Sequence, residues 1–317
     1  MPGSMSSPMQ SASPTPLQSF NRIVVFGVGL IGGSFALALK QANAVKQVIG
    51  VGRRAETLKR AQAFGIIDEI GDATSVSDAD LVLIAAPVAQ TEALLRELAP
   101  HLQAGTVVTD AGSTKGDVVQ AARAALGNKI AQFVPGHPIA GREQNGPEAA
   151  LPALYRGKKV VLTALPENSP ASIATVASAW QHCGAHIHHL GAEEHDAVFA
   201  AVSHLPHLLA YALVDDIAAR TNADRLFQYA ASGFRDFTRI AGSSPEMWRD
   251  ISLANRTALL AELDAYTAQL SILRAMLAAS DGAALEQVYS RAQSARQAWI
   301  AAIEATEQAR TYEQGGD

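Results

Sequence analysis

The sequence contains one cysteine, Cys183, among 317 residues. A single thiol cannot form an internal disulfide, so a reducing cytoplasm suits the chain. Basic residues are not in excess, and the formal net charge of −5 argues against a surface for nucleic acid or anionic membranes. No apolar stretch is long enough to predict a bilayer-spanning helix. These absences predict a cytoplasmic protein that binds neither nucleic acid nor a membrane.

The first twenty residues lack both the charged start and the apolar core of a secretory signal. Their Ser/Pro-rich composition predicts a disordered leader over residues 1–20. The remaining chain has an ordinary globular composition, with nearly half of all residues apolar, and is long enough for two domains.

From Arg22 onward, short β-branched runs alternate with alanine-rich stretches of helical spacing. The expected strands are 22–27, 47–51, 81–86, 106–110, 130–134, 158–164 and 185–190, and the expected helices are 34–42, 55–65, 91–102, 115–127 and 171–184. The strand runs are continuously apolar, as in strands covered on both faces. This alternation predicts a doubly wound α/β fold, a Rossmann-type domain over residues 21–190.

The pattern changes after Gly191, where no convincing strand is found. Long alanine- and leucine-rich stretches carry polar residues at helical intervals, including 261–280 and 284–309. We expect an all-helical domain over residues 191–317. By analogy at the level of the fold, such a domain commonly forms a homodimer beside a nucleotide domain.

The stretch "VVFGVGLIGGS" places Gly27, Gly29 and Gly32 in the G-x-G-x-x-G spacing, after an expected strand and at the start of a helix. The first glycine permits the tight turn, the second lets the backbone approach a pyrophosphate, and the third allows close packing of the helix. Leu30 and Ile31 begin the helix, whose free N–H groups can face phosphates. A purely structural turn is the weaker alternative, so this domain is predicted to bind a dinucleotide.

The end of the second strand separates the two nicotinamide cofactors. NAD sites usually place an acidic residue there for the ribose hydroxyl, whereas this chain has Gly52 followed by Arg53 and Arg54. Guanidinium groups suit a 2′-phosphate, which favours NADP, with NAD as the alternative if the arginines are only solvated charge. Pro87, which follows the strand run 81–86, is also assigned to the cofactor site.

Further candidates are expected at the carboxyl ends of the strands or in the helical half. "TDAGSTKGD" supplies Ser113 at a strand-to-helix turn, where helix capping is the simpler role. "GHPIAG" holds His137 between a glycine and a proline; it suits proton transfer, although a turn histidine in solvent is the simpler alternative. The helical half adds "VSHLPHLLAYAL", with Ser203, His204 and His207, and "GFRDFTRIAGSSPEMWRD", with Arg235, Arg239 and Trp248.

Five stretches together closely resemble the prephenate and arogenate dehydrogenase family of tyrosine biosynthesis. They are "GVGLIGGS", "DAGSTK", "GHPIAG", "SHLPHLLA" and "FRDFTRIAGSSPEMW", in the order of that family, and they span the chain from Arg22 to about Asn255. The resemblance implies an oxidative decarboxylation in which a cyclohexadienyl ring loses hydride from C4 and carbon dioxide from C1. It implies that His137 accepts the hydroxyl proton, that Ser113 binds the hydroxyl or orients His137, and that Arg239 binds the ring carboxylate.

The resemblance also implies that Ser203 and His207 line the side-chain end of the pocket. Trp248 matches a family tryptophan that reaches in from the second subunit. Arg142 stands where relatives often have a small hydroxyl residue, so it is expected either to pair with the pyruvyl carboxylate of prephenate or to face solvent. The neighbouring Glu143 would instead suit the ammonium of arogenate, and the substrate preference stays open.

Two other functions are alternatives. A 3-hydroxyacid dehydrogenase usually relies on a lysine that is missing near "SHLPH", and a dinucleotide-sensing regulator would not need His137 and Arg239 to converge. The segment "HCGAHIHHL" is rich in histidine but lacks the spacing of a structural zinc site, so no metal is expected. Residues 193–196, Glu-Glu-His-Asp, are interpreted as a charged first helical turn.

Overall fold

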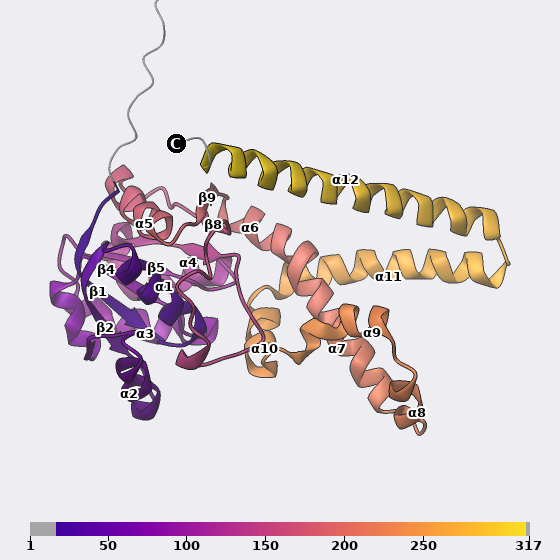
Figure 1. Cartoon of the computed structure of the whole chain (residues 1–317), viewed down its shortest axis with the longest axis horizontal. Coiled ribbons are helices and arrows are strands. Elements are labelled where there is room, and N and C mark those ends of the chain that lie inside the picture. Colours follow the sequence, from indigo (N-terminus) through magenta and orange to yellow (C-terminus); the bar gives the residue numbers. More distant parts are fainter. Residues whose placement is uncertain (1–16, 315–317) are drawn as a thin grey trace, which may run out of the picture. The chain divides into compact units, whose positions relative to one another are not determined.

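The computed structural model describes residues 17–314, and side chains up to residue 305 (Figure 1). The chain divides into two compact units, the first ending at Leu259 and the second beginning at Leu260. Most of the predicted leader, residues 1–16, lies outside the described residues. Its end does not fit a disordered leader, because the Gln18 N–H donates to Ser178 Oγ at 2.7 Å and Phe20 already begins a strand.

A six-stranded parallel sheet forms the centre of the first unit. Its strands are β1 (Phe20–Phe26), β2 (Val45–Val51), β3 (Glu69–Ile70), β4 (Leu81–Ile84), β5 (Val107–Asp110) and β6 (Phe133–Val134). Their order, β3-β2-β1-β4-β5-β6, reverses direction between β1 and β4, and such a switch point is where ligands bind in doubly wound folds. The predicted fold class is therefore confirmed.

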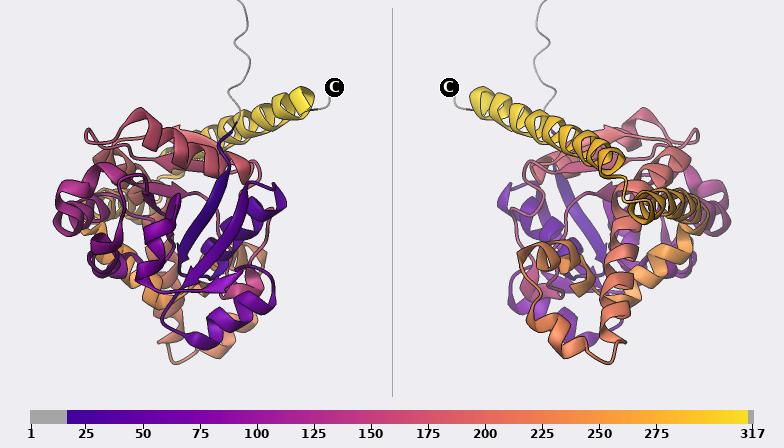
Figure 2. Two further views of the ribbon diagram at one scale, coloured as in Figure 1. Left: turned by 90° about the vertical axis from the view of Figure 1, so that its left-hand side faces the viewer. Right: turned by 90° about the vertical axis from the view of Figure 1, so that its right-hand side faces the viewer.

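Helices cover both faces of this sheet (Figure 2). They are α1 (Leu30–Gln41), α2 (Ala55–Ala63), α3 (Thr91–Leu98), α4 (Gly116–Leu126) and α5 (Pro170–His182). Alternate residues of β1 belong to two cores: Ile23 and Val25 pack with side chains of α1 and α5, and Val24 and Phe26 with those of α3 and α4. Burial on both faces explains why the strand runs are continuously apolar.

A second, three-stranded sheet differs from the sequence prediction. It consists of β7 (Gly136–Pro138), β8 (Lys159–Leu162) and β9 (His186–His189), with β7 antiparallel to β8 and β9 parallel to it. The runs 158–164 and 185–190 were expected to extend the main sheet, and that detail was wrong. Pro135 interrupts the ladder after β6 because it has no N–H to donate, and its carbonyl accepts from Thr163 N at 2.9 Å. His137 consequently lies inside a strand rather than at the end of one.

The remainder of the first unit is helical, and the described residues after Gly191 contain no strand. The helices are α6 (Ala192–Phe199), α7 (Leu205–Ala218), α8 (Ala223–Gln228), α9 (Ser232–Thr238) and α10 (Pro245–Ala254), and a π-helical turn, Ala200–His204, joins α6 to α7. By length and composition, the continuous run Ala192–Ala218 is apolar enough to cross a membrane, which corrects the expectation that no stretch is long enough. Several of its side chains, including Phe199 and Leu205, are buried in this unit, and core helices pass the same test.

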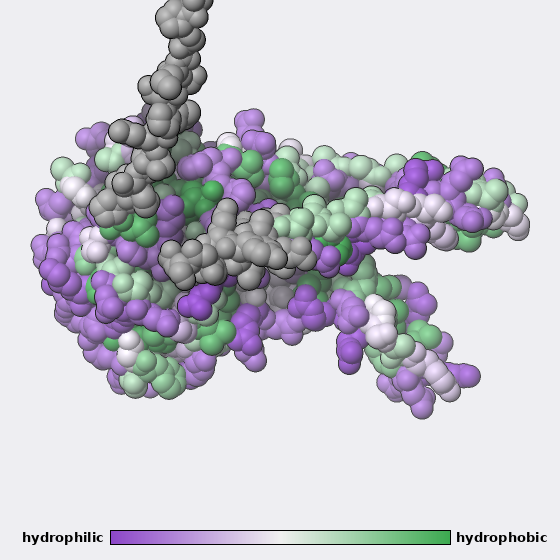
Figure 3. Space-filling model, turned by 45° about the horizontal axis from the view of Figure 1, so that its top comes forward, coloured by the Kyte–Doolittle hydropathy of each residue, from purple (hydrophilic) through white to green (hydrophobic). Residues whose placement is uncertain are grey.

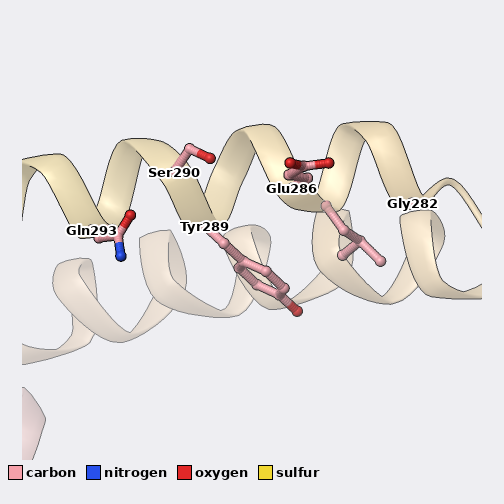
Figure 4. A pocket seen from close by; sticks show the side chains of 6 residues that line it. Gly282, Glu286, Tyr289, Ser290 and Gln293 are labelled. Atoms are coloured by element: carbon pink, nitrogen blue, oxygen red, sulfur yellow. The ribbon is translucent and has the colours of Figure 1, made fainter.

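The second unit is a pair of long helices, α11 (Arg256–Ala278, which begins in the first unit) and α12 (Gly282–Gln314). Apolar residues lie among polar ones along this pair (Figure 3). The large exposed apolar side chains on it are Leu260, Leu270, Ile272, Leu277, Tyr289 and Trp299. A hollow beside α12 is lined by residues of that helix alone, including Glu286 and Tyr289 (Figure 4), and it contains none of the predicted site residues.

Candidate active site

The glycine loop after β1 has the shape that a dinucleotide requires. Gly27 has a φ of +92°, and a Cβ there would lie 2.6 Å from the Ala85 carbonyl oxygen. A Cβ on Gly32 would lie 2.2 Å from the Gly27 carbonyl oxygen, so both positions need glycine to fold. A Cβ on Gly29 would meet nothing within 4 Å. The second glycine is therefore not demanded by packing, and its open side is where a phosphate can approach the backbone.

The first turn of α1 is ready to receive an anion. No side chain caps this helix at Gly29, so the N–H groups at its start keep their capacity to bind phosphate oxygens. Leu30 is buried, and the Ile31 carbonyl accepts a hydrogen bond from Tyr155 Oη at 2.6 Å, which fixes the turn. Burial raises the pKa of Tyr155 well above its ordinary value, so this hydroxyl stays a donor.

The residues assigned to the ribose end are at the surface. Arg53 and Arg54 follow β2 and are exposed, with Arg54 at the N-terminus of α2. Pro87 is exposed after β4, at the start of the turn Val88–Gln90. Since β1, β2 and β4 are parallel neighbours, these residues lie at the same carboxyl edge of the sheet as the glycine loop.

A buried ion pair holds the turn that carries Ser113. Lys115 Nζ lies 2.6 Å from Asp110 Oδ2, and both side chains are inaccessible to solvent. The other carboxylate oxygen of Asp110 accepts the N–H of Gly136 at 3.0 Å. The pair therefore ties the β5–α4 turn, with the half-buried Ser113, to the strand that carries His137.

His137 is a buried histidine with a specific partner. Its Nδ1 lies 2.8 Å from Nε2 of His195. Burial lowers the pKa of His137 well below its ordinary value, and the nearby His195, Lys115 and His204 lower it further. The imidazole is therefore neutral at pH 7 and able to accept a proton. The alternative of a turn histidine in solvent was wrong.

His195 and Asp196 were missed by the sequence analysis, which placed them in a charged first helical turn. His195 is fully buried, and its Nδ1 lies 2.8 Å from Asp196 Oδ1. Asp196 also accepts the N–H groups of Lys115 and Gly116, each at 2.8 Å, at the start of α4. Burial would raise the pKa of Asp196, but these hydrogen bonds, from His195 first, outweigh it and lower the pKa. Nothing in the local sequence distinguishes this pair from surface charge.

The network continues into the π-helical turn. His204 is buried, and its Nδ1 lies 3.0 Å from Nδ2 of Asn255, which also donates to the Asp196 carbonyl at 2.8 Å. Burial is the main cause that lowers the pKa of His204 to about 4. π-Helical turns often occur at functional sites, and this one presents both Ser203 and His204.

His207 and Trp248 form one stacked pair. Their ring centroids are 3.5 Å apart at 18°, and His207 Nδ1 lies 2.9 Å from the Ser203 carbonyl oxygen. Trp248 is 9% exposed within its own chain. Its helix, α10, packs on the turn Val88–Gln90, which brings this pair beside the cofactor edge.

Arg239 already has a carboxylate partner. Its Nη1 lies 2.8 Å from Glu143 Oε1, with both side chains exposed. Glu143 and the exposed Arg142 belong to the loop that follows β7, so the structure brings Arg239 to the loop directly after the strand of His137. An arginine that can exchange a protein carboxylate for a substrate carboxylate is suited to bind an anionic ring.

No group of three or more His, Cys, Asp or Glu side chains is arranged to hold a metal ion within residues 17–305. The histidine-rich segment instead forms the end of α5 and strand β9.

Comparisons with known proteins identify the family. The model of the "Prephenate dehydrogenase, nucleotide-binding domain" matches residues 35–189, and that of the "Prephenate dehydrogenase, dimerization domain" matches residues 191–290. A cyclohexadienyl dehydrogenase of Zymomonas mobilis is 37% identical over 282 residues, which are 87% of this chain and 95% of that protein. The chain belongs to the prephenate dehydrogenase family. A prephenate dehydrogenase of Bacillus subtilis is 36% identical over 88% of this chain and 76% of its own length.

The fold of this family member agrees with a solved relative. The prephenate dehydrogenase of A. aeolicus, in complex with hydroxyphenyl propionate and NAD⁺, superimposes with a TM-score of 0.82 at 34% identity, over 90% of this chain and 99% of that one. The chain is accordingly an NAD(P)-dependent dehydrogenase whose reaction is an oxidative decarboxylation with hydride transfer to the nicotinamide cofactor.

Proposed function

We propose that this dehydrogenase acts on prephenate, arogenate or both, with NADP favoured over NAD. The observation that supports the proposal is the buried, neutral His137 on β7, whose neighbour Gly136 donates its N–H to Asp110 at the end of β5. A neutral imidazole in that position suits the removal of a hydroxyl proton.

The chemistry divides among the residues of this chain. A bound nicotinamide supplies the acceptor for the hydride that leaves ring carbon C4. His137 takes the hydroxyl proton as the C4–O bond becomes a carbonyl, with Ser113 beside it to orient the hydroxyl. The C1–carboxylate bond then breaks, carbon dioxide leaves, and its electron pair makes the ring aromatic. The phenolate oxygen takes the proton back from His137, so the enzyme returns to its starting state.

Arg239 is proposed to bind the ring carboxylate, which has to replace Glu143 at its guanidinium. Ser203, His207 and Trp248 are proposed to line the side-chain end, because they form one contacting group on the π-helical turn, α7 and α10. Arg142 would favour the pyruvyl carboxylate of prephenate. Glu143, once released from Arg239, would favour the ammonium of arogenate, so the loop after β7 is where substrate preference is decided.

NADP preference is proposed from Arg53 and Arg54, which stand where an NAD site carries an acidic residue. Gly27, Gly29 and Gly32, together with the first turn of α1 at Leu30 and Ile31, would hold the pyrophosphate, and Pro87 and Ser113 would complete the cofactor site.

We also propose a homodimer in the cytoplasm, with a nucleotide segment over residues 21–190 and a helical segment over 191–317. The exposed apolar side chains of α11 and α12 support association through the helical segment. No role for nucleic acid or a membrane is proposed, since the charge of −5 offers no basic field.

A four-way assay tests substrate and cofactor together. The purified protein is given prephenate or arogenate with NAD or NADP, and the absorbance of the reduced nicotinamide is followed. The highest kcat/KM is expected with NADP, and the better substrate assigns the role of the loop after β7. If all four mixtures fail to turn over while dinucleotide still binds, the proposal is wrong, and a sensor or a 3-hydroxyacid dehydrogenase becomes the better hypothesis.

A further inference from the structure

A line of side chains runs from His137 to the start of α4. His137 Nδ1 contacts His195 Nε2 at 2.8 Å, and His195 Nδ1 contacts Asp196 Oδ1 at 2.8 Å. Both imidazoles are buried, and the rings of His137 and His195 also pack edge to face. No local pattern in the sequence connects these residues, and the proposed proton transfer involves His137 directly and His195 only through this contact.

The donors and acceptors along this line can be assigned from one end. Asp196 receives backbone N–H groups on both oxygens, from Lys115 and from Gly116, so the carboxylate is ionised and can only accept. The proton between Asp196 and His195 must therefore be on His195 Nδ1.

The remaining nitrogens follow. Burial keeps His195 neutral by lowering its pKa, so its Nε2 carries no proton and is an acceptor. The 2.8 Å contact then requires His137 Nδ1 to donate. His137 is neutral as well, so its Nε2 carries the free lone pair.

We propose that His195, anchored by Asp196, is a positioning residue that holds His137 in the Nδ1–H tautomer, so that Nε2 is the atom that accepts the hydroxyl proton of the substrate. This inference rests on the proposed role of His137. In the reaction, Nε2 gains the proton, His137 becomes a cation, and its Nδ1–H still donates to His195. The proton returns from Nε2 to the phenolate, so no proton needs to pass to His195 or Asp196.

The charges around His137 affect how strongly its cation holds the proton. At His137, the neighbouring His195, Lys115 and the His204 of the π-helical turn disfavour a cation. The carboxylates of Asp196 and Asp110 act on the next ring along the line, where they favour a cation on His195. Lys115 is neutralised at close range by Asp110. Burial, more than the paired Lys115, lowers the pKa of His137 and so its affinity for the proton, which favours the return of that proton to the phenolate.

¹⁵N NMR of the purified wild-type protein, with ¹⁵N-labelled histidine, tests the tautomer of His137 directly. The ring signals of His137, assigned by their loss in His137→Asn, are expected to show a protonated Nδ1 and an unprotonated Nε2 at pH 7.5. A wild-type His137 that carries its proton on Nε2 would overturn the inference.

Three variants test the function of the contact. His195→Leu removes both hydrogen bonds and is expected to lower kcat by about 10²-fold, with the KM for substrate and cofactor little changed, and to shift His137 toward the Nε2–H form. His195→Gln places an amide oxygen near the former Nε2 and is expected to restore the tautomer and most of kcat. His189→Gln, an exposed histidine on β9, is the matched control and should behave as wild type in both readouts.

The outcomes separate the two proposals. If His195→Leu folds, as judged by its Tm, and keeps wild-type kcat, His195 does not position the base. If His137→Asn abolishes turnover while the wild-type tautomer is Nε2–H, the role of His137 stands and this inference is wrong. If His137→Asn retains full activity, the proposed role of His137 is itself wrong.

Discussion

The glycine loop after β1 exposes its backbone to open space at Gly29, whereas the region around His137 is filled with side chains that contact one another. A Cβ on Gly29 would meet nothing within 4 Å, yet His137 has His195 at 2.8 Å and is surrounded by buried polar groups. The glycine loop is a short continuous segment, whereas the surroundings of His137 come from strands and helices far apart in the chain. Changes at the first should alter binding, and changes at the second should alter chemistry and stability together.

The largest effect is expected for His137→Asn. Losing the base should lower kcat by about 10²- to 10⁴-fold. Dinucleotide affinity should stay near the wild-type value, because the hydrogen-bond partner of this side chain is His195, on α6, and not the glycine loop. Steady-state kinetics and titration of the cofactor measure both quantities. A variant that loses cofactor binding along with turnover would show that the two ends are not separable.

Two variants of the glycine loop separate its role in stability from its proposed role in dinucleotide binding. Gly32→Ala places a methyl 2.2 Å from the Gly27 carbonyl oxygen, and this backbone clash should cost about 1–3 kcal/mol of unfolding free energy. Gly29→Ala meets no protein atom within 4 Å and should keep the wild-type Tm, but weaken dinucleotide binding about tenfold, or ~1.4 kcal/mol. Thermal unfolding and cofactor titration of the pair provide the measurement. Equal losses of Tm in both variants would contradict the assignment of Gly29 to phosphate binding.

The buried histidines should make stability fall in acid. The pKa of His204 is about 4 in the fold against 6.5 for the free side chain, so its stability contribution is complete above pH 6.5 and is lost as pH falls toward 4. His204→Asn keeps an acceptor for Asn255 but cannot titrate. It should therefore lose about 2 kcal/mol less between pH 7 and pH 5 than wild type does. Urea unfolding at the two pH values gives the comparison, with the exposed His189→Asn as a control that should keep the wild-type slope.

The smallest effect is expected on cofactor affinity, at the exposed arginines that follow β2. Arg53→Ala and Arg54→Ala should each raise the Kd for NADP about tenfold through loss of a charged hydrogen bond, while NAD affinity and Tm stay unchanged because both side chains are exposed. Isothermal titration with the two cofactors tests this. Equal effects on NAD and NADP would remove the basis for the proposed preference.

Much of the fold follows from patterns that act over a few residues. Continuous apolar runs and helical spacing predicted the main sheet and its helices, and the spacing of Gly27, Gly29 and Gly32 predicted the loop shape that the structure shows. The second sheet was missed because β7 is only three residues long and follows β6 after a single residue, Pro135, whose carbonyl accepts from Thr163 of the next segment. The stacking of Trp248 on His207 joins two helices 41 positions apart and could not be read from spacing alone.

By itself the sequence determined the doubly wound domain, the helical second half, the glycine loop and His137 as the histidine of interest, since each depends on neighbours in the chain. Only the tertiary structure decided what His137 contacts. His195 is 58 positions away from it, and Asp196 reaches its backbone donor at Lys115 across 81 positions. Their meeting requires α6 to pack against the start of α4, where the free N–H groups of a helix hold the carboxylate. Such a contact is produced by the burial of whole elements, and no local pattern of residues encodes it.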